Sequence, residues 1–148
     1  MKYDITDFTG RQVTVSPRLA LYAVKDFMGT ELPGLAVILD DVTDPSEPEQ
    51  YAVLTVSFGE FIGMKNCAYI DTNNCDFADQ LQSQGLASDT GFYKASGFCQ
   101  YPLWQFEEGT LREIDNDVYQ KYSDAYDGYM ASMYGDEPDE DGIQEISL

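Results

Sequence analysis

The stretch NDVYQKYSDAYDGYMASMY (residues 116–134) decides the fold class of this chain. Its larger apolar side chains recur every three or four residues, which is the spacing of one face of an α-helix. They are Tyr119, Tyr122, Tyr126, Tyr129 and Met133. Asp115 or Asn116 can cap the start of this helix, and Gly135 can cap its end. We therefore expect a long amphipathic helix near the C-terminus.

The residues before this helix show the alternation and the turn residues of β-strands. We expect strands over residues 3–8, 12–16, 19–23, 35–40, 51–58 and 67–71. Pro17 should interrupt the second strand because proline cannot donate to a ladder, and residues 30–34 should form a loop. A short helix is expected over residues 76–83, and Pro102 suggests an edge position or a bend. The sequence thus predicts an α+β fold, an antiparallel β-sheet with one short helix and the long helix packed on it.

The charge of the chain is distributed unevenly along its length. Its 148 residues contain 27 acidic and 8 basic side chains, which give a net charge of −19 with no histidine. Six of the acids lie in residues 136–148, which contain no base. We expect one domain over residues 1–135, followed by an acidic and mobile tail over residues 136–148.

Composition also limits the possible functions. A charge of −19 should repel nucleic acids and anionic membranes, so neither is an expected partner. The lack of histidine excludes Ser-His-Asp and Cys-His catalysis and histidine-ligated zinc. Cys67, Cys75 and Cys99 form no CxxC pair, and the chain begins without a secretory signal, so we expect three reduced thiols in a cytoplasmic protein.

No cofactor or metal site is expected. Residues 137–142 match the first half of an EF-hand calcium loop, but the twelfth position is Leu148 instead of the required Glu. No glycine-rich phosphate loop is present. An enzyme would have to use a pair of carboxylates in a cleft, which the sequence does not indicate, so we expect a protein without catalytic residues.

Several strings in the middle of the chain carry a resemblance. Ile70-Asp71-Thr72-Asn73-Asn74 and Ser96-Gly97-Phe98-Cys99 followed by Gln-Tyr-Pro are the specific ones. The chain resembles a family of small proteins of unknown function carried on plasmids and conjugative elements of gut bacteria. The resemblance implies a setting on mobile DNA, in which small acidic proteins often block restriction or CRISPR enzymes. It implies no catalytic residue.

Two functional hypotheses follow. The first is an inhibitor of the anti-CRISPR or antirestriction type, whose carboxylates occupy a basic nucleic-acid channel of a CRISPR effector or restriction nuclease. The carboxylates assigned to this role are Asp115, Asp117, Asp124, Asp127, Asp136, Glu137, Asp139, Glu140 and Asp141, then Asp40, Asp41, Asp44, Glu47 and Glu49. The second is an accessory module of a mobile element that binds another protein through the aromatic residues 92–106. The competing explanation of the acidic charge is solubility alone, and the competing explanation of the aromatic residues is an ordinary sheet core.

Overall fold

The longest strands, β2 (Gln12–Lys25) and β3 (Glu31–Asp41), pair antiparallel from Val15 opposite Asp41 to Lys25 opposite Glu31. The structure is a computed structural model that describes residues 1–135. These strands form the centre of a four-stranded sheet with the order β1-β2-β3-β4, whose outer strands are β1 (Tyr3–Thr6) and β4 (Glu49–Val53). Alternate residues of β2 are buried, including Val13, Val15 and Leu19, because successive side chains point to opposite faces.

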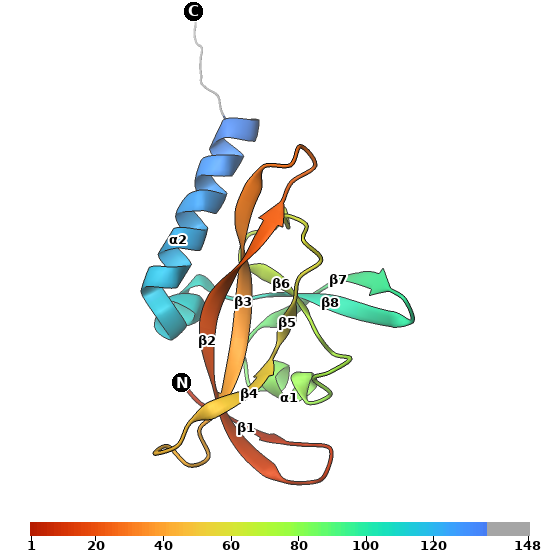
Figure 1. The fold of residues 1–148 in the computed structure, drawn as a ribbon, viewed down its shortest axis with the longest axis vertical. Coiled ribbons are helices and arrows are strands. Elements are labelled where there is room, and N and C mark those ends of the chain that lie inside the picture. Colours follow the sequence, from red (N-terminus) through yellow and green to blue (C-terminus); the bar gives the residue numbers. More distant parts are fainter. Residues whose placement is uncertain (136–148) are drawn as a thin grey trace, which may run out of the picture.

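A second antiparallel sheet has the order β5-β6-β8-β7. Its strands are β5 (Thr55–Val56), β6 (Cys67–Ile70), β7 (Ser88–Ser96) and β8 (Cys99–Gln105). Strand β6 pairs with β8 only as far as Leu103, and β7 and β8 continue beyond it as a hairpin that projects from the body (Figure 1). Pro102 lies in this projecting part, where no strand covers the other side of β8, which agrees with the expected edge position.

Leu54 connects the two sheets. Its N–H donates to the Val37 carbonyl in the first sheet at 2.9 Å, and its carbonyl accepts the Asp71 N–H beside the second sheet at 2.8 Å. The next residue, Thr55, is buried and accepts the Val37 N–H with its hydroxyl at 3.1 Å. The expected single strand over residues 51–58 is therefore wrong, because the chain changes sheets at Leu54.

Two helices complete the fold, as the sequence predicts. Helix α1 (Ala78–Ser83) is short, and helix α2 (Glu108–Tyr134) runs along β2 and β3 (Figure 1). Helix α2 begins eight residues before the expected start at Asn116 and is kinked at Asp115, where φ is −162°. The Asp115 carboxylate accepts the Val118 N–H at 3.1 Å and so caps the second segment, as expected.

One contiguous core lies between the two sheets and extends to α2. The first sheet contributes Ile5 and Leu39, the second contributes Ile70 and Trp104, and α2 contributes Tyr119, all at most 2% exposed. The helix is therefore held on the sheets by its tyrosine stripe, as the periodicity predicts. No helix among residues 1–135 is long and apolar enough to cross a membrane.

Two further local expectations are wrong. Pro17 does not interrupt β2 but pairs in register with Leu39. The Thr14 carbonyl accepts the Val42 N–H, so the backbone of Thr14 faces β3, and the direction alternates from residue to residue. The nitrogen of Pro17 therefore faces the β1 side of the sheet. Strand β1 pairs no further than Tyr3 opposite Val15, so the missing N–H of Pro17 costs no β1 pair. Residues 31–34 are not loop but the start of β3, where the long pairing with β2 overrides the local turn preference.

Candidate functional site

A row of tyrosine hydroxyls on α2 holds the loop over residues 57–66 in place. Tyr119 donates to Asn66 Oδ1 at 2.8 Å, Tyr122 accepts the Asn66 N–H at 2.9 Å, and Tyr126 donates to the Gly63 carbonyl at 3.0 Å. Asn66 has a positive φ of 67°, a conformation that asparagine tolerates better than most residues. The loop is thus fixed from one side by α2.

The same loop is fixed from the other side by the end of β2. The Lys25 N–H donates to the Gly59 carbonyl and the Phe61 N–H donates to the Lys25 carbonyl, both at 2.9 Å. Residues 59–61 therefore have a defined place beside the turn between β2 and β3.

A fourth tyrosine joins α2 to the turn between β2 and β3. Tyr129 donates to Asp26 Oδ2 at 2.7 Å, while Asp26 Oδ1 accepts the N–H groups of Met28 and Thr30. The bond from Tyr129, with those N–H groups, lowers the pKa of Asp26. The same bond to Asp26 raises the pKa of Tyr129 to about 12. The turn, the loop and the end of α2 form one bonded unit.

This unit surrounds a hollow of about 560 Å³, which we call the helix-end groove. Its lining residues are Lys25, Asp26, Phe27, Glu60, Phe61, Gly63, Tyr129, Met130 and Tyr134. Two of its rings stand largely in solvent, since Phe27 is 82% and Tyr134 is 71% exposed. The groove therefore has aromatic walls, two carboxylates and one lysine.

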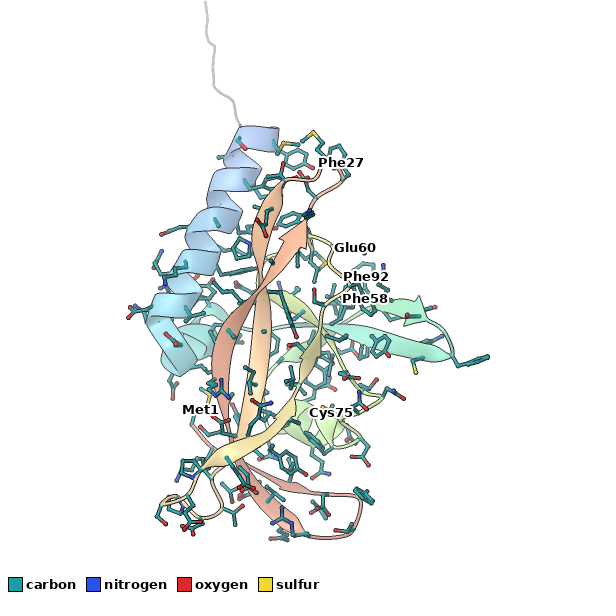
Figure 2. All side chains as sticks on the ribbon, viewed as in Figure 1. Met1, Phe27, Phe58, Glu60, Cys75 and Phe92 are labelled. Atoms are coloured by element: carbon teal, nitrogen blue, oxygen red, sulfur yellow. The ribbon has the colours of Figure 1, made fainter. Side chains whose placement is uncertain are left out.

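A second hollow of about 450 Å³, the hairpin groove, adjoins the first. Its lining residues are Glu60, Phe61, Ile62, Gly63, Met64, Tyr69, Phe92, Tyr93 and Leu103. Phe92 and Tyr93 are more than half exposed, and Phe98 at the hairpin tip is fully exposed. Figure 2 shows Phe27, Glu60 and Phe92 on the same side of the molecule. Exposed rings gathered around two hollows are typical of a protein-binding surface.

Glu60 lies where the two grooves meet. Its Oε1 accepts a hydrogen bond from Lys94 Nζ on β7 at 2.7 Å, and that ammonium lies 5.3 Å from the centre of the Phe58 ring. The Glu60 side chain is 63% exposed and the Lys94 side chain 32%. Phe58 in turn packs against Tyr69 and Tyr101, with ring centres 5.5 and 5.4 Å apart. A carboxylate and an aromatic ring thus already hold one cation between them.

The acids assigned from the sequence on α2 have different surroundings. Asp115 caps the helix, Asp124 accepts the Gln120 amide at 2.7 Å, and Asp127 pairs with Lys65 at 2.9 Å. Asp117 is exposed, and its carboxylate has no hydrogen bond or ion pair to the rest of residues 1–135. Three of these four carboxylates are therefore already bonded within the chain.

The second acidic group lies at the other end of the first sheet. Asp40 pairs with Arg18 at 2.8 Å, Asp41 lies 3.5 Å from Arg11, and Asp44 accepts from Ser46 inside its own turn. Hydrogen bonds from Thr43 and from Ser46 lower the pKa of Asp41 and of Asp44, respectively. Glu47 and Glu49 are exposed.

The structure does not bring all of the assigned acids together. The turn before β4 lies far below most of α2 in the view of Figure 1. The remaining assigned acids, Asp136, Glu137, Asp139, Glu140 and Asp141, lie outside the described residues.

The aromatic residues within 92–106 have different surroundings. Trp104 and Phe106 are at most 2% exposed and belong to the core, whereas Phe92, Tyr93 and Phe98 face solvent. Phe27, Met28 and the loop over residues 59–64 are not among the residues assigned from the sequence. The pair Phe27-Met28 next to Gly29 could have indicated this surface in the sequence. Two large apolar side chains in the turn between two strands have no core to enter.

The cysteines offer no reactive thiol in the interior. Burial raises the pKa of Cys67 and of Cys75 to about 11, so both remain protonated at neutral pH. All three cysteines are free. No group of three or more metal-binding side chains lies together within residues 1–135.

These features define the class: an α+β protein of two antiparallel sheets and a C-terminal helix, with an aromatic surface beside the second sheet. The chain belongs to the family described as Domain of unknown function (DUF4313), which matches residues 24–126. No curated protein and no solved structure matches it. The matched segment contains every residue that lines the hairpin groove but ends before Tyr129, Met130 and Tyr134 of the helix-end groove. The setting on mobile DNA stays a prediction.

Proposed function

We propose that this chain is a non-enzymatic protein-binding module that docks on a basic surface of another protein through its two grooves. The single observation that carries this proposal is the exposure of Phe27, Phe92, Tyr93 and Tyr134 around two adjoining hollows. Exposed rings of this kind act as anchors when a partner removes them from water. The partner is a protein, with no direct binding to nucleic acid or membrane.

The charge of the chain supports a basic partner. Residues 1–135 contain 21 acidic and 8 basic side chains, so the described part alone carries −13. A field of this sign accelerates encounter with a basic protein and disfavours nucleic acids. The free, buried thiols Cys67 and Cys75 suit a reducing cytoplasm, which we propose as the location.

A second candidate is inhibition of a CRISPR effector or restriction nuclease by occupation of its nucleic-acid channel. The net charge favours it, and Asp117, Glu47 and Glu49 are exposed carboxylates that such a channel can contact. It ranks second because several of the assigned carboxylates are bonded to other groups of the chain itself.

The experiment is a pull-down from a bacterial lysate that contains restriction and CRISPR enzymes, with the full chain as bait. The bait variants are Phe92→Ser with Tyr93→Ser, and Asp117→Asn with Asp124→Asn. Phe8→Ser is the matched control, because Phe8 is 86% exposed but lies in the turn between β1 and β2, away from both grooves.

The proposal predicts a partner that the wild type and Phe8→Ser retain and that the Phe92/Tyr93 variant loses. Loss only in the Asp117/Asp124 variant, with release by added DNA and by salt, would favour the nuclease inhibitor instead. Equal retention by all baits would contradict both candidates.

A further inference from the structure

The two hollows adjoin each other. The helix-end groove and the hairpin groove share Glu60, Phe61 and Gly63 in their linings. We call their union the long groove. Rings stand at both of its ends, Phe27 and Tyr134 at one and Phe92 and Tyr93 at the other, and Glu60 lies in the middle.

The chain holds three of its own basic side chains by a recurring combination of one carboxylate and one ring. Lys94 lies on Glu60 and Phe58, and Lys65 lies 2.9 Å from Asp127 and 5.9 Å from the Tyr126 ring centre. Arg112 lies 2.8 Å from Glu108 with its guanidinium 4.8 Å from the Tyr119 ring centre. This arrangement combines ionic and cation–π attraction.

We propose that the long groove binds an extended segment of the partner protein and that an arginine of this segment takes the place of Lys94 on Glu60. The inference rests on the proposed function and names the chemistry that the groove recognises. Apolar side chains of the segment pack on the rings at the two ends. Glu60 accepts the guanidinium with both oxygens, since Oε2 makes no hydrogen bond to other residues of 1–135.

Charge complementarity selects this occupant. A second copy of the chain brings the same negative charge to the groove, and residues 136–148 contain six acids and no base. Arginine fits better than lysine because its planar fork matches both carboxylate oxygens and can stack on a ring. Lys25 is the one basic residue among those that line the two grooves, and it lines the helix-end groove only.

The test uses NMR of the full-length chain and two peptides blocked at both ends. The first is Gly-Ser-Leu-Arg-Leu-Ser-Gly, and the second replaces arginine by citrulline, which has the same shape without the charge. The amide signals of Gly59 and Gly63 report the loop. We expect the arginine peptide to shift these signals and to bind about tenfold more tightly than the citrulline peptide.

Two variants change the proposed anchor in opposite directions. Glu60→Gln should weaken the arginine peptide about tenfold and abolish its advantage over citrulline. Lys94→Met keeps the aliphatic stem over Phe58 and removes the competing ammonium, so it should strengthen binding about two- to fivefold. Asp117→Asn, a change at another exposed carboxylate, is the control and should leave both affinities unchanged.

Equal binding of both peptides, or equal weakening by Glu60→Gln and Asp117→Asn, would overturn the inference. A concentration-dependent dimer in sedimentation that Phe92→Ser dissolves would assign the groove to a second copy and would also overturn it. In the pull-down, the Phe92→Ser/Tyr93→Ser bait could lose a partner that the wild-type and Glu60→Gln baits both retain. This result would support the proposed function and refute the arginine anchor.

Discussion

The tyrosine row of α2 and the exposed rings around the long groove are both aromatic, but their surroundings differ. Each of Tyr119, Tyr122, Tyr126 and Tyr129 has its hydroxyl bonded to the loop or to the turn that it contacts. Phe27, Phe92 and Tyr93 are between 58% and 82% exposed. The first group fixes the position of the loop, and the second group stands on the surface that the loop helps to form.

The difference teaches how to separate structural from functional aromatics in this chain. A ring whose polar atom is bonded and whose carbon atoms are buried stabilises the fold, and its loss should appear as lost stability. A ring in solvent contributes little to folding, and its loss should appear only when a partner is present. The same distinction applies to the carboxylates, among which Asp115 is bonded and Asp117 is not.

The largest expected effect comes from the aromatic residues of β8 and the hairpin. Trp104→Ala should lower the free energy of unfolding by about 3 to 5 kcal/mol, because it removes a large side chain from the core. Phe98→Ala should change it by less than about 0.5 kcal/mol. Urea denaturation measures both. Similar losses for the two variants would erase the distinction.

A smaller effect is expected for a single hydroxyl. Tyr122→Phe leaves the Asn66 N–H without its acceptor and should cost about 1 to 2 kcal/mol of stability. Tyr93→Phe is the matched change in the exposed set and should be neutral. Thermal unfolding followed by circular dichroism compares them, and a neutral Tyr122→Phe would show that the row does not hold the loop.

Two carboxylates of α2 allow the same comparison between a bonded and an exposed side chain, with an expected difference in stability of about 1 kcal/mol. Asp115→Ala removes the cap at the kink and should destabilise the protein by about 1 kcal/mol. Asp117→Ala, two residues later and exposed, should have little effect. If Asp117→Ala were the more damaging change, Asp117 would have a structural role that its exposure does not suggest.

The smallest effect depends on pH. The pKa of Asp26 is lower in the folded protein than in the unfolded chain, so its contribution to stability is present above the unfolded pKa of about 3.9. It is lost as the pH falls through the lower, folded value. Asp26→Asn should therefore be less stable than wild type at pH 7, and the two should converge below pH 4. A pH series of melting temperatures tests this, and a constant difference would refute it.

Much of the fold could be predicted from the sequence because its patterns are local. The spacing of Tyr119, Tyr122 and Tyr126 is enough to indicate the helix and its buried face, and Asp115 is a capping residue in the right place. The division into two sheets depends on hydrogen bonds between Leu54, Val37 and Asp71, which no local pattern encodes. The unbroken strand through Pro17 depends in the same way on where β1 ends.

The candidate site was less predictable than the fold. Phe92 and Tyr93 lie in the aromatic stretch that the second hypothesis names, but their neighbours Trp104 and Phe106 are buried. The other half of the surface comes from the turn between β2 and β3 and from residues 59–64. Backbone bonds at Lys25 and the contacts of Tyr129 with Asp26 and Phe61 bring these segments together. Such contacts between distant segments are invisible in the order of residues.

Leu54 has a consequence for the dynamics of the protein. Because its amide group bonds one sheet through N–H and the other through its carbonyl, neither sheet can separate without breaking a bond at this residue. Its side chain is also completely buried. Its amide hydrogen should therefore exchange with deuterium only when the whole molecule unfolds, which makes Leu54 a reporter of global opening. The hairpin of β7 and β8 should exchange much sooner, while the joint between the sheets stays closed.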